Sequence, residues 1–234
     1  MKNAALTFII CILTCITITS SAQLSVGLRG GISLAKIDFD SESGEDITNL
    51  LGVDISIPLE IRISNAVALQ PELNYIRKGV EGDYSETELI GNDEYVEEGK
   101  GSVFLNYLAI PVFGKYILET GNIDFFLLAG PVLGYAMSGN SEATLTFKVN
   151  GQVVNMFSED ADIEFNDEDG FKRFEFGLGF GAGVGANVGS GKLFLDARYN
   201  LGLSAVSEDE TEGDKGYNRA LSFALGYLIP LGAK

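Results

Sequence analysis

An alternation of apolar and small or polar residues with a period of two constrains the fold of this chain more than any other feature. It is clearest in 174–187, where Phe174, Phe176 and Leu178 begin an apolar set that alternates with Glu175 and five glycines. Such a period is the signature of a β-strand with two different faces. The same scheme recurs in four further segments: 24–36, 51–62, 193–204 and 221–230. Three other segments are strand-like but less regular: 67–77, 103–118 and 123–137. In 103–118 and 123–137 both faces are apolar in places, so the sequence does not decide which face points inward.

These eight segments suit a barrel in a membrane. Each is long enough for the roughly 9–11 tilted residues with which a β-strand crosses a bilayer. Because lipid offers no hydrogen-bond partners, a sheet in a membrane must close on itself. We therefore predict an all-β fold, an eight-stranded antiparallel up-and-down transmembrane β-barrel in the cell outer membrane. Aromatic residues near the segment ends suit the membrane interfaces, with core packing as the alternative: Tyr75, Tyr107, Tyr116, Phe125, Tyr135, Phe171, Tyr199, Tyr217 and Tyr227.

The connections between the segments alternate in length, and the long ones carry most of the negative charge. Short connections with turn residues lie at 64–65, 119–122 and 189–191, and long ones at about 37–48, 79–101, 139–170 and 207–217. The long connections hold 26 of the 33 acidic residues, which explains how a net charge of −17 coexists with a mean hydropathy of +0.17. Outer-membrane barrels have short turns at one end and long extracellular loops at the other. A soluble lipocalin-like barrel, the alternative, would place its charged face outward.

The N-terminus predicts secretion. Lys2 precedes an apolar run over 4–18, and small residues at 20–22 follow it, which is the layout of a signal peptide cleaved after Ala22. A retained membrane anchor is the alternative, but the run is shorter than the roughly 20 residues that a spanning helix needs. We predict a signal peptide over 1–22 and a barrel domain over 23–234. Both cysteines, Cys11 and Cys15, lie in the leader, so the mature chain would use no thiol chemistry.

The interior of an eight-stranded barrel is only wide enough for side chains to fill. Charged residues on the small or polar faces of the segments predict a lumen charge network of both signs: Arg29, Asp54, Glu60, Glu72, Lys115, Glu175, Asp196 and Arg198. Buried charges are tolerated when they are paired and hydrogen-bonded. We interpret the network as a salt-bridged plug, with an ion path or a catalytic carboxylate pair as the functional alternative.

Two further motifs suggest ligand sites. The glycines over 177–185 loosely resemble a nucleotide-binding loop, but such a loop needs a strand–turn–helix context, so we predict no nucleotide site. The acidic cluster at 166–170 contains Asp167, Glu168 and Asp169, whose oxygens suit calcium. The cluster lacks the EF-hand spacing. We interpret it as a solvated loop, with Ca²⁺ binding there as the alternative, and expect no other metal or cofactor.

Four short motifs resemble the PorT-like outer-membrane β-barrel domain family of Gram-negative bacteria. They are the glycine-rich opening strand 27–31, the Gln-Pro-Glu-Leu-Asn-Tyr run at 70–75, and the segments 107–111 and 129–131. The resemblance covers nearly the whole mature chain and implies an eight-stranded barrel whose role is mostly unassigned. It also implies that some relatives take part in protein secretion across the outer membrane. This chain has Ala109 where the family often has an acidic residue.

For function, we predict a non-enzymatic outer-membrane protein that is structural or binds a partner through acidic extracellular loops. The absence of histidine removes the commonest general base, and no nucleophile elbow is present. The alternatives are a component of a protein-secretion system, a narrow porin-like channel, and a barrel enzyme that uses a pair of carboxylates. The expected partners are outer-membrane lipid, the barrel-assembly machinery and a protein at the loops. We expect no nucleic acid partner and a monomeric state.

Overall fold

The computed structural model of the chain describes residues 24–39, 47–165, 171–208 and 215–231. All of its regular elements are strands: β1 (Leu24–Phe39), β2 (Ile47–Thr48), β3 (Leu50–Arg62), β4 (Val67–Ile90), β5 (Asp93–Glu119), β6 (Ile123–Val149), β7 (Gln152–Asp162), β8 (Phe174–Val188), β9 (Gly191–Gly202), β10 (Ser207–Glu208) and β11 (Lys215–Pro230). No helix among these residues is long and apolar enough to cross a membrane. The predicted signal peptide over 1–22 lies outside the described residues.

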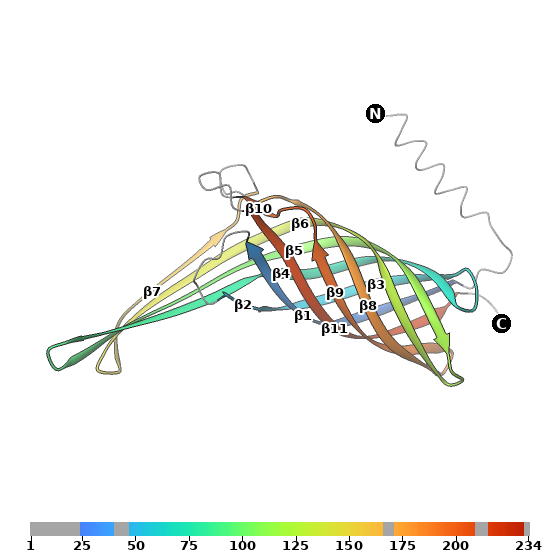
Figure 1. Cartoon of the computed structure of the whole chain (residues 1–234), viewed down its shortest axis with the longest axis horizontal. Helices are drawn as coiled ribbons and strands as arrows, with labels where there is room; N and C mark the ends of the chain where they lie inside the picture. Colours follow the sequence, from blue (N-terminus) through green and yellow to red (C-terminus); the bar gives the residue numbers. More distant parts are fainter. Residues whose placement is uncertain (1–23, 40–46, 166–170, 209–214, 232–234) are drawn as a thin grey trace, which may run out of the picture.

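Eight strands form a closed antiparallel ring in the order β1-β3-β4-β5-β6-β8-β9-β11, and β11 pairs back onto β1 (Figure 1). The closing seam is continuous, from Ser25 opposite Pro230 to Phe39 opposite Gly216. Closure leaves the ring without an open edge, which is the arrangement that a sheet needs where no water can satisfy its backbone. The predicted eight-stranded up-and-down barrel is confirmed.

The period-two pattern places apolar side chains outside the ring and polar ones inside. In β3, Leu51 and Ile55 are 62% and 51% exposed, whereas Asp54 and Glu60 are buried. This is the reverse of a soluble barrel, whose apolar face points inward. A continuous apolar outer surface on a closed ring is the surface that contacts hydrocarbon.

Segments 103–118 and 123–137, whose inward face the sequence does not decide, lie in β5 and β6 and have a definite inner face in the structure. In β5 the buried side chains are at odd positions, among them Leu105 and Phe113, while Ile110 on the even face is exposed. In β6 even positions such as Phe126 are buried up to a β-bulge, where Asn106 of β5 faces Ser138 but the next residue faces Ala136. The bulge adds one residue to β6 and switches its inner face from even to odd positions.

The ring has one end with short turns and one with long connections. The three turns of the short-turn end are residues 63–66, 120–122 and 189–190, and in two of them a glycine adopts the left-handed conformation, Gly121 with φ 88° and Gly189 with φ 63°. Tight turns use glycine at such positions because a side chain there would clash with the backbone. The first and last strands of the ring, β1 and β11, also begin and end at the short-turn end.

The expectation that 79–101 and most of 139–170 form long loops is wrong. In the structure β4 and β5 continue to a tight turn at Gly91, and β6 continues to an Asn-Gly turn and returns as β7. We call the part beyond the ring the projecting sheet: residues 80–90 of β4, 93–103 of β5, 139–149 of β6, and β7. Figure 1 shows it as two hairpins that extend away from the short-turn end. The density of charge in these segments suggested loops, but an open sheet can carry polar residues on solvated faces.

The two hairpins have the turn residues that the geometry demands. Asn150 and Gly151 both have positive φ, 51° and 78°, which defines the type I′ turn favoured by Asn-Gly pairs. Asn150 also joins the two tips, because its N–H donates to the carbonyl of Glu94 at 2.8 Å and its side-chain oxygen accepts from the Glu94 N–H at 2.9 Å. The hairpins are therefore linked at their far ends as well as through the β5–β6 pairing.

Candidate functional site

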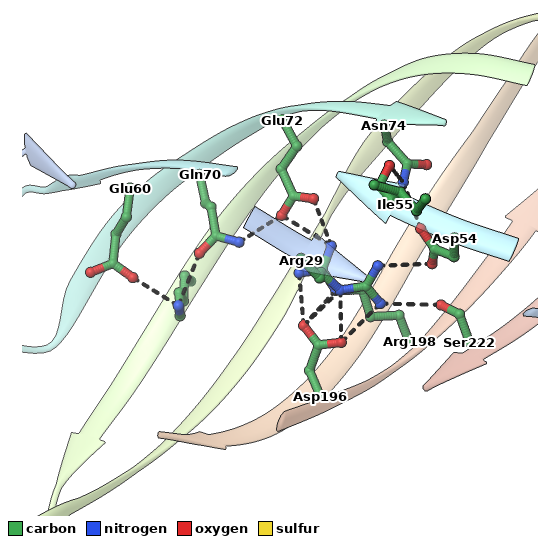
Figure 2. A network of polar contacts seen from close by, with 11 residues as sticks. Arg29, Asp54, Ile55, Glu60, Gln70, Glu72, Asn74, Asp196, Arg198 and Ser222 are labelled. Atoms are coloured by element: carbon green, nitrogen blue, oxygen red, sulfur yellow. Dashed lines mark hydrogen bonds and ion pairs between the residues drawn. The ribbon is translucent and has the colours of Figure 1, made fainter. Parts of the chain in front are cut away.

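The centre of the lumen contains an arginine held between two carboxylates. Arg29 on β1 reaches Asp54 on β3 at 2.8 Å and Asp196 on β9 at 2.9 Å, and both partners are buried with it. A terminal nitrogen of Arg29 also donates to the hydroxyl of Ser222 on β11 at 3.4 Å. Figure 2 shows these contacts converging on one guanidinium from several strands. The alternation of each strand brings the residues inward, and closure of the ring brings them together.

A second arginine extends the network. Arg198 binds both oxygens of Glu72 at 2.9 and 3.0 Å, and it also reaches Asp196 at 2.8 Å (Figure 2). Asp196 therefore lies between the two guanidinium groups. These are charge-assisted hydrogen bonds, which are stronger than hydrogen bonds between neutral groups. The result is a chain of alternating charges, Asp54 to Arg29 to Asp196 to Arg198 to Glu72.

The network continues through an amide to a lysine pair. Gln70 donates to Glu72 at 2.6 Å and accepts from Lys115 at 2.9 Å, and Lys115 binds Glu60 at 2.7 Å. At the end of β3, Arg62 pairs with Glu60 at 3.2 Å. Four buried carboxylates thus meet three buried cations and the partly buried Arg62, which also binds the exposed Glu119 at 2.6 Å.

A separate polar cluster lies toward the end with long connections. Lys78 contacts the two oxygens of Glu175 at 2.8 and 3.0 Å, and Asn218 donates to the same carboxylate at 3.1 Å. Asn218 also donates to the hydroxyl of Tyr107 at 3.2 Å. Tyr107 is fully buried here, so of its two expected places it takes the packed interior and not a membrane interface. The inward phase of β5 decides its position.

All eight residues predicted for the lumen are buried inside the ring. Seven belong to the first network, and Glu175 belongs to the second cluster with Lys78. The sequence reasoning missed Lys78, Gln70 and Asn74, the last of which donates to Asp54 at 2.6 Å. The signal for them was present, because all three share the even phase of Glu72 on β4.

Apolar layers share the lumen with the charged network, and its cations lie over their rings: Lys115 is 4.2 Å from the centroid of Phe126, and Arg198 is 5.2 Å from that of Phe113. One contains Phe113, Phe126 and Phe194 with smaller residues, and the other contains Leu105, Ile76 and neighbours. Ile163, Phe165 and Phe171 pack against the second layer from the connection that follows β7. The interior of the ring is thus filled by charged and apolar side chains that contact one another.

Inward glycines make room for the rings of these layers. A Cβ on Gly226 would lie 2.2 Å from the ring of Phe194, and one on Gly183 would lie 2.3 Å from the ring of Phe126. Gly183 belongs to the glycine series of β8, which runs as a strand and does not lead into a helix. The series therefore packs aromatic side chains, and it lacks the context of a nucleotide-binding loop.

Outside the ring, the projecting sheet is strongly acidic and partly apolar. It contains twelve acidic residues and two lysines, of which Lys148 pairs with Glu98 at 2.5 Å. The face that continues the inner face of the barrel carries an aromatic group, in which Phe147 and Phe157 meet edge to face. On the same face the hydroxyl of Tyr84 donates to Glu97 at 2.9 Å, and this hydrogen bond raises the pKa of the phenol above its ordinary value.

No group of three or more Asp, Glu, Cys or His is arranged to hold a metal ion within the described residues. The calcium candidates Asp167, Glu168 and Asp169 lie outside those residues, so a cation site there stays a prediction. In the lumen network each of the four carboxylates, Asp54, Glu60, Glu72 and Asp196, has a cationic partner.

Comparison with known proteins gives a family match and several structural likenesses. Residues 19–208 match the model of a family described as outer membrane protein beta-barrel domain. The structure of Neisserial surface protein A is 16% identical, with 91% of this chain and 100% of that chain covered and a TM-score of 0.45. For Ail, the attachment invasion locus protein of Yersinia pestis, the identity is 15%, the coverage 88% and 98%, and the TM-score 0.38. No curated protein matches the chain.

Proposed function

The chain belongs to the outer membrane protein beta-barrel domain family and lies in the cell outer membrane, and from this premise we propose that its barrel is a closed anchor for an extracellular binding sheet. The bound partner is a protein, and the chain acts as a monomer with no enzymatic activity, no cofactor and no nucleic acid ligand. Outer-membrane barrels have short periplasmic turns and longer extracellular connections. The projecting sheet then lies outside the cell.

The observation that carries this proposal is the contrast between the two parts of the molecule. The ring is filled by paired charges and aromatic side chains, whereas the projecting sheet holds ordered strands in solvent with exposed apolar and acidic residues. Ordering β7 outside the ring costs conformational entropy, on the order of 1–2 kcal/mol for each residue. In a barrel that served only as a membrane component, nothing would favour ordered strands that carry this entropy cost.

The filled lumen argues against the porin-like alternative. Arg29 and Arg198 cross the interior and each bridges two carboxylates, so an ion would have to break several paired contacts to pass. We expect purified, folded protein in planar lipid bilayers to show no stable single-channel currents. Folding of each sample is checked by the different gel mobility of unheated and boiled protein. Reproducible currents from folded protein would show that the barrel conducts.

The binding role is tested with a trimmed variant that keeps the ring. Because Gly82 faces Gly101 and Ala143 faces Glu159, residues 83–100 and 144–158 can each be replaced by an Asn-Gly turn. Intact cells that express either form are treated with a protein crosslinker, and the adducts are compared. We expect adducts of the full chain that the trimmed variant lacks. Identical adducts from both forms at equal surface expression would contradict the proposal.

The PorT-like motifs support a role in protein secretion as the second candidate function. Their positions in the barrel weaken this support. Arg29, Glu72 and Asn74 come from two of these motifs, and all three belong to the lumen network. The motifs therefore account for the plug and mark a type of barrel. Membership of a secretion machine predicts stable co-purification of periplasmic or inner-membrane components after crosslinking, which the trimmed variant would retain.

A further inference from the structure

The strand β7 is an edge of the projecting sheet with nothing beside it in the described part of the chain. It pairs only with β6, and all eleven of its residues are exposed. β8, which is the neighbour of β6 within the ring, pairs with β6 only up to Tyr135 and does not reach the projecting sheet. An edge of this kind presents unpaired backbone groups to any other extended chain.

The direction of the free backbone groups follows from one hydrogen bond. The N–H of Ile163, just after β7, donates to the carbonyl of Gly139 at 3.0 Å, so odd positions from Asn155 to Ile163, where the pairing is regular, direct their N–H toward β6. Even positions then direct theirs toward the open edge, because alternate residues of a strand point opposite ways. The open donors are the N–H groups of Ser158, Asp160 and Asp162. The N–H of Met156 is taken by the side chain of Asn155 at 2.9 Å.

The outer half of β7 carries no lysine or proline, and its one protective feature is a bulge at Val154, where Phe147 of β6 faces Asn155 but Lys148 faces Val153. Natural edges carry lysine, proline, bulges or inward charges. The other edge of the projecting sheet follows that rule, since β2 covers Glu81 and Gly82 of β4 and acids follow at intervals. The outer half of β7 instead exposes Val153, Val154, Met156 and Phe157 by 57–63%.

The charge of β7 identifies the chemistry of an added strand. Glu159, Asp160 and Asp162 lie at the end of β7 nearest the ring, within a sheet of twelve acidic and two basic residues. A second copy of this chain is a poor occupant. Two barrels in one membrane have parallel axes, so two symmetry-related β7 strands would run side by side in the same direction. Their acidic ends would then face each other, and like charges directly opposite are destabilising.

We propose that β7 accepts an extended, cationic polypeptide segment from a partner protein as an additional strand of the projecting sheet. The segment places lysine or arginine against Glu159, Asp160 and Asp162, and apolar residues against Met156 and Phe157. Its backbone pairs with the open donors at Ser158, Asp160 and Asp162. This inference rests on the proposed binding role of the projecting sheet and specifies its mode.

The test uses the full chain, folded in lipid nanodiscs, and a labelled peptide of about nine residues, the length of an ordinary strand. The peptide has three lysines in one half and alternating valine and threonine in the other, and a matched peptide has glutamate for lysine. Ser158→Pro removes an outward N–H at an edge position, where proline is tolerated. Ser158→Ala is the matched control, because it removes the same hydroxyl contact to Thr144 but keeps the N–H.

We expect the cationic peptide to bind wild type and Ser158→Ala within about twofold of each other, and Ser158→Pro at least about tenfold more weakly. The acidic peptide should not bind. Equal affinity for both variants would show that the peptide only adsorbs to negative charge, and it would overturn the proposal. So would an absence of binding to the wild type.

Amide hydrogen exchange of the wild type gives a readout that does not depend on a variant. The amides of Asp160 and Asp162 should exchange more slowly when the cationic peptide is bound, and unchanged exchange at saturation would refute strand addition. The crosslinking experiment on cells separates the two proposals. If trimming removes the adducts but Ser158→Pro keeps them, the binding role stands and the β7 inference falls.

Discussion

Replacing Arg29 by methionine tests whether the lumen behaves as a dry plug. The side chain is fully buried and lies 2.8 Å from Asp54 and 2.9 Å from Asp196. Methionine has a similar length, so the change removes the charge with little loss of volume. Asp196 keeps two contacts from Arg198, at 2.8 and 2.9 Å, whereas the side-chain hydrogen bonds left to Asp54 come from the neutral groups of Asn74 and Ser222.

The expected loss in the free energy of unfolding has an upper and a lower estimate. Removal of one partner from a buried ion pair costs about 3–5 kcal/mol, because the other charge stays buried without compensation. If water filled the lumen, the same pair would contribute only about 0–1 kcal/mol, as exposed pairs do. We expect Arg29→Met to lower the free energy of unfolding by about 3–5 kcal/mol. Arg29→Met combined with Asp54→Asn should recover most of that loss, since the uncompensated carboxylate is then gone.

The measurement is urea-induced unfolding in lipid vesicles, followed by circular dichroism and by the gel mobility of unheated samples. The control is Lys36→Met on the same strand, whose pair with Asp38 at 2.5 Å is largely exposed. We expect that control to change stability by less than about 1 kcal/mol. A loss below about 1 kcal/mol for Arg29→Met, or no recovery in the double variant, would refute the plug and favour a hydrated interior.

Three other substitutions probe the packing and the projecting sheet. Gly226→Val should destabilise the fold by about 1–3 kcal/mol, because its side chain meets the ring of Phe194, and Phe194→Leu in the same chain should relieve part of the loss in urea unfolding. Asn150→Ala should speed amide exchange at Glu94 while global stability stays unchanged, because the tip contact and the residue suited to positive φ are lost. Lys78→Met should cost about 3–5 kcal/mol in the same unfolding assay, since its carboxylate partner stays buried.

The barrel could be predicted from the sequence because alternation reports directly which face of a strand meets lipid. Where the two faces differ, as in Leu51 and Asp54 of β3, the inward charged residues could also be named. Where both faces are apolar, as with Leu105 inside and Ile110 outside on β5, the pattern could not give the register. Pairings across the ring were out of reach, because they depend on how far each strand is staggered when the sheet closes.

The projecting sheet was missed for a different reason. Charge and polarity indicate a loop, yet a sheet solvated on both faces needs no apolar alternation. The Asn-Gly pair at 150–151, between Phe147 and Val153, was the available signal, since Asn-Gly flanked by apolar residues is a strong indication of a hairpin. Lys78 was missed similarly, because the strand was expected to end one residue before it.

Strands β4, β5 and β6 run without a break from the ring into the projecting sheet. The distance from the ring to the tips of that sheet can therefore change by insertions in these strands. Inserting two residues in each of two paired strands would move a tip outward by about 6–7 Å and leave every side chain on its original face. A single-residue insertion would exchange the two faces of that strand. The bulge of β6 at the ring boundary is such an insertion, and it already sets the phase from there to the tip. Length changes in even steps are therefore open to evolution without any change in the barrel.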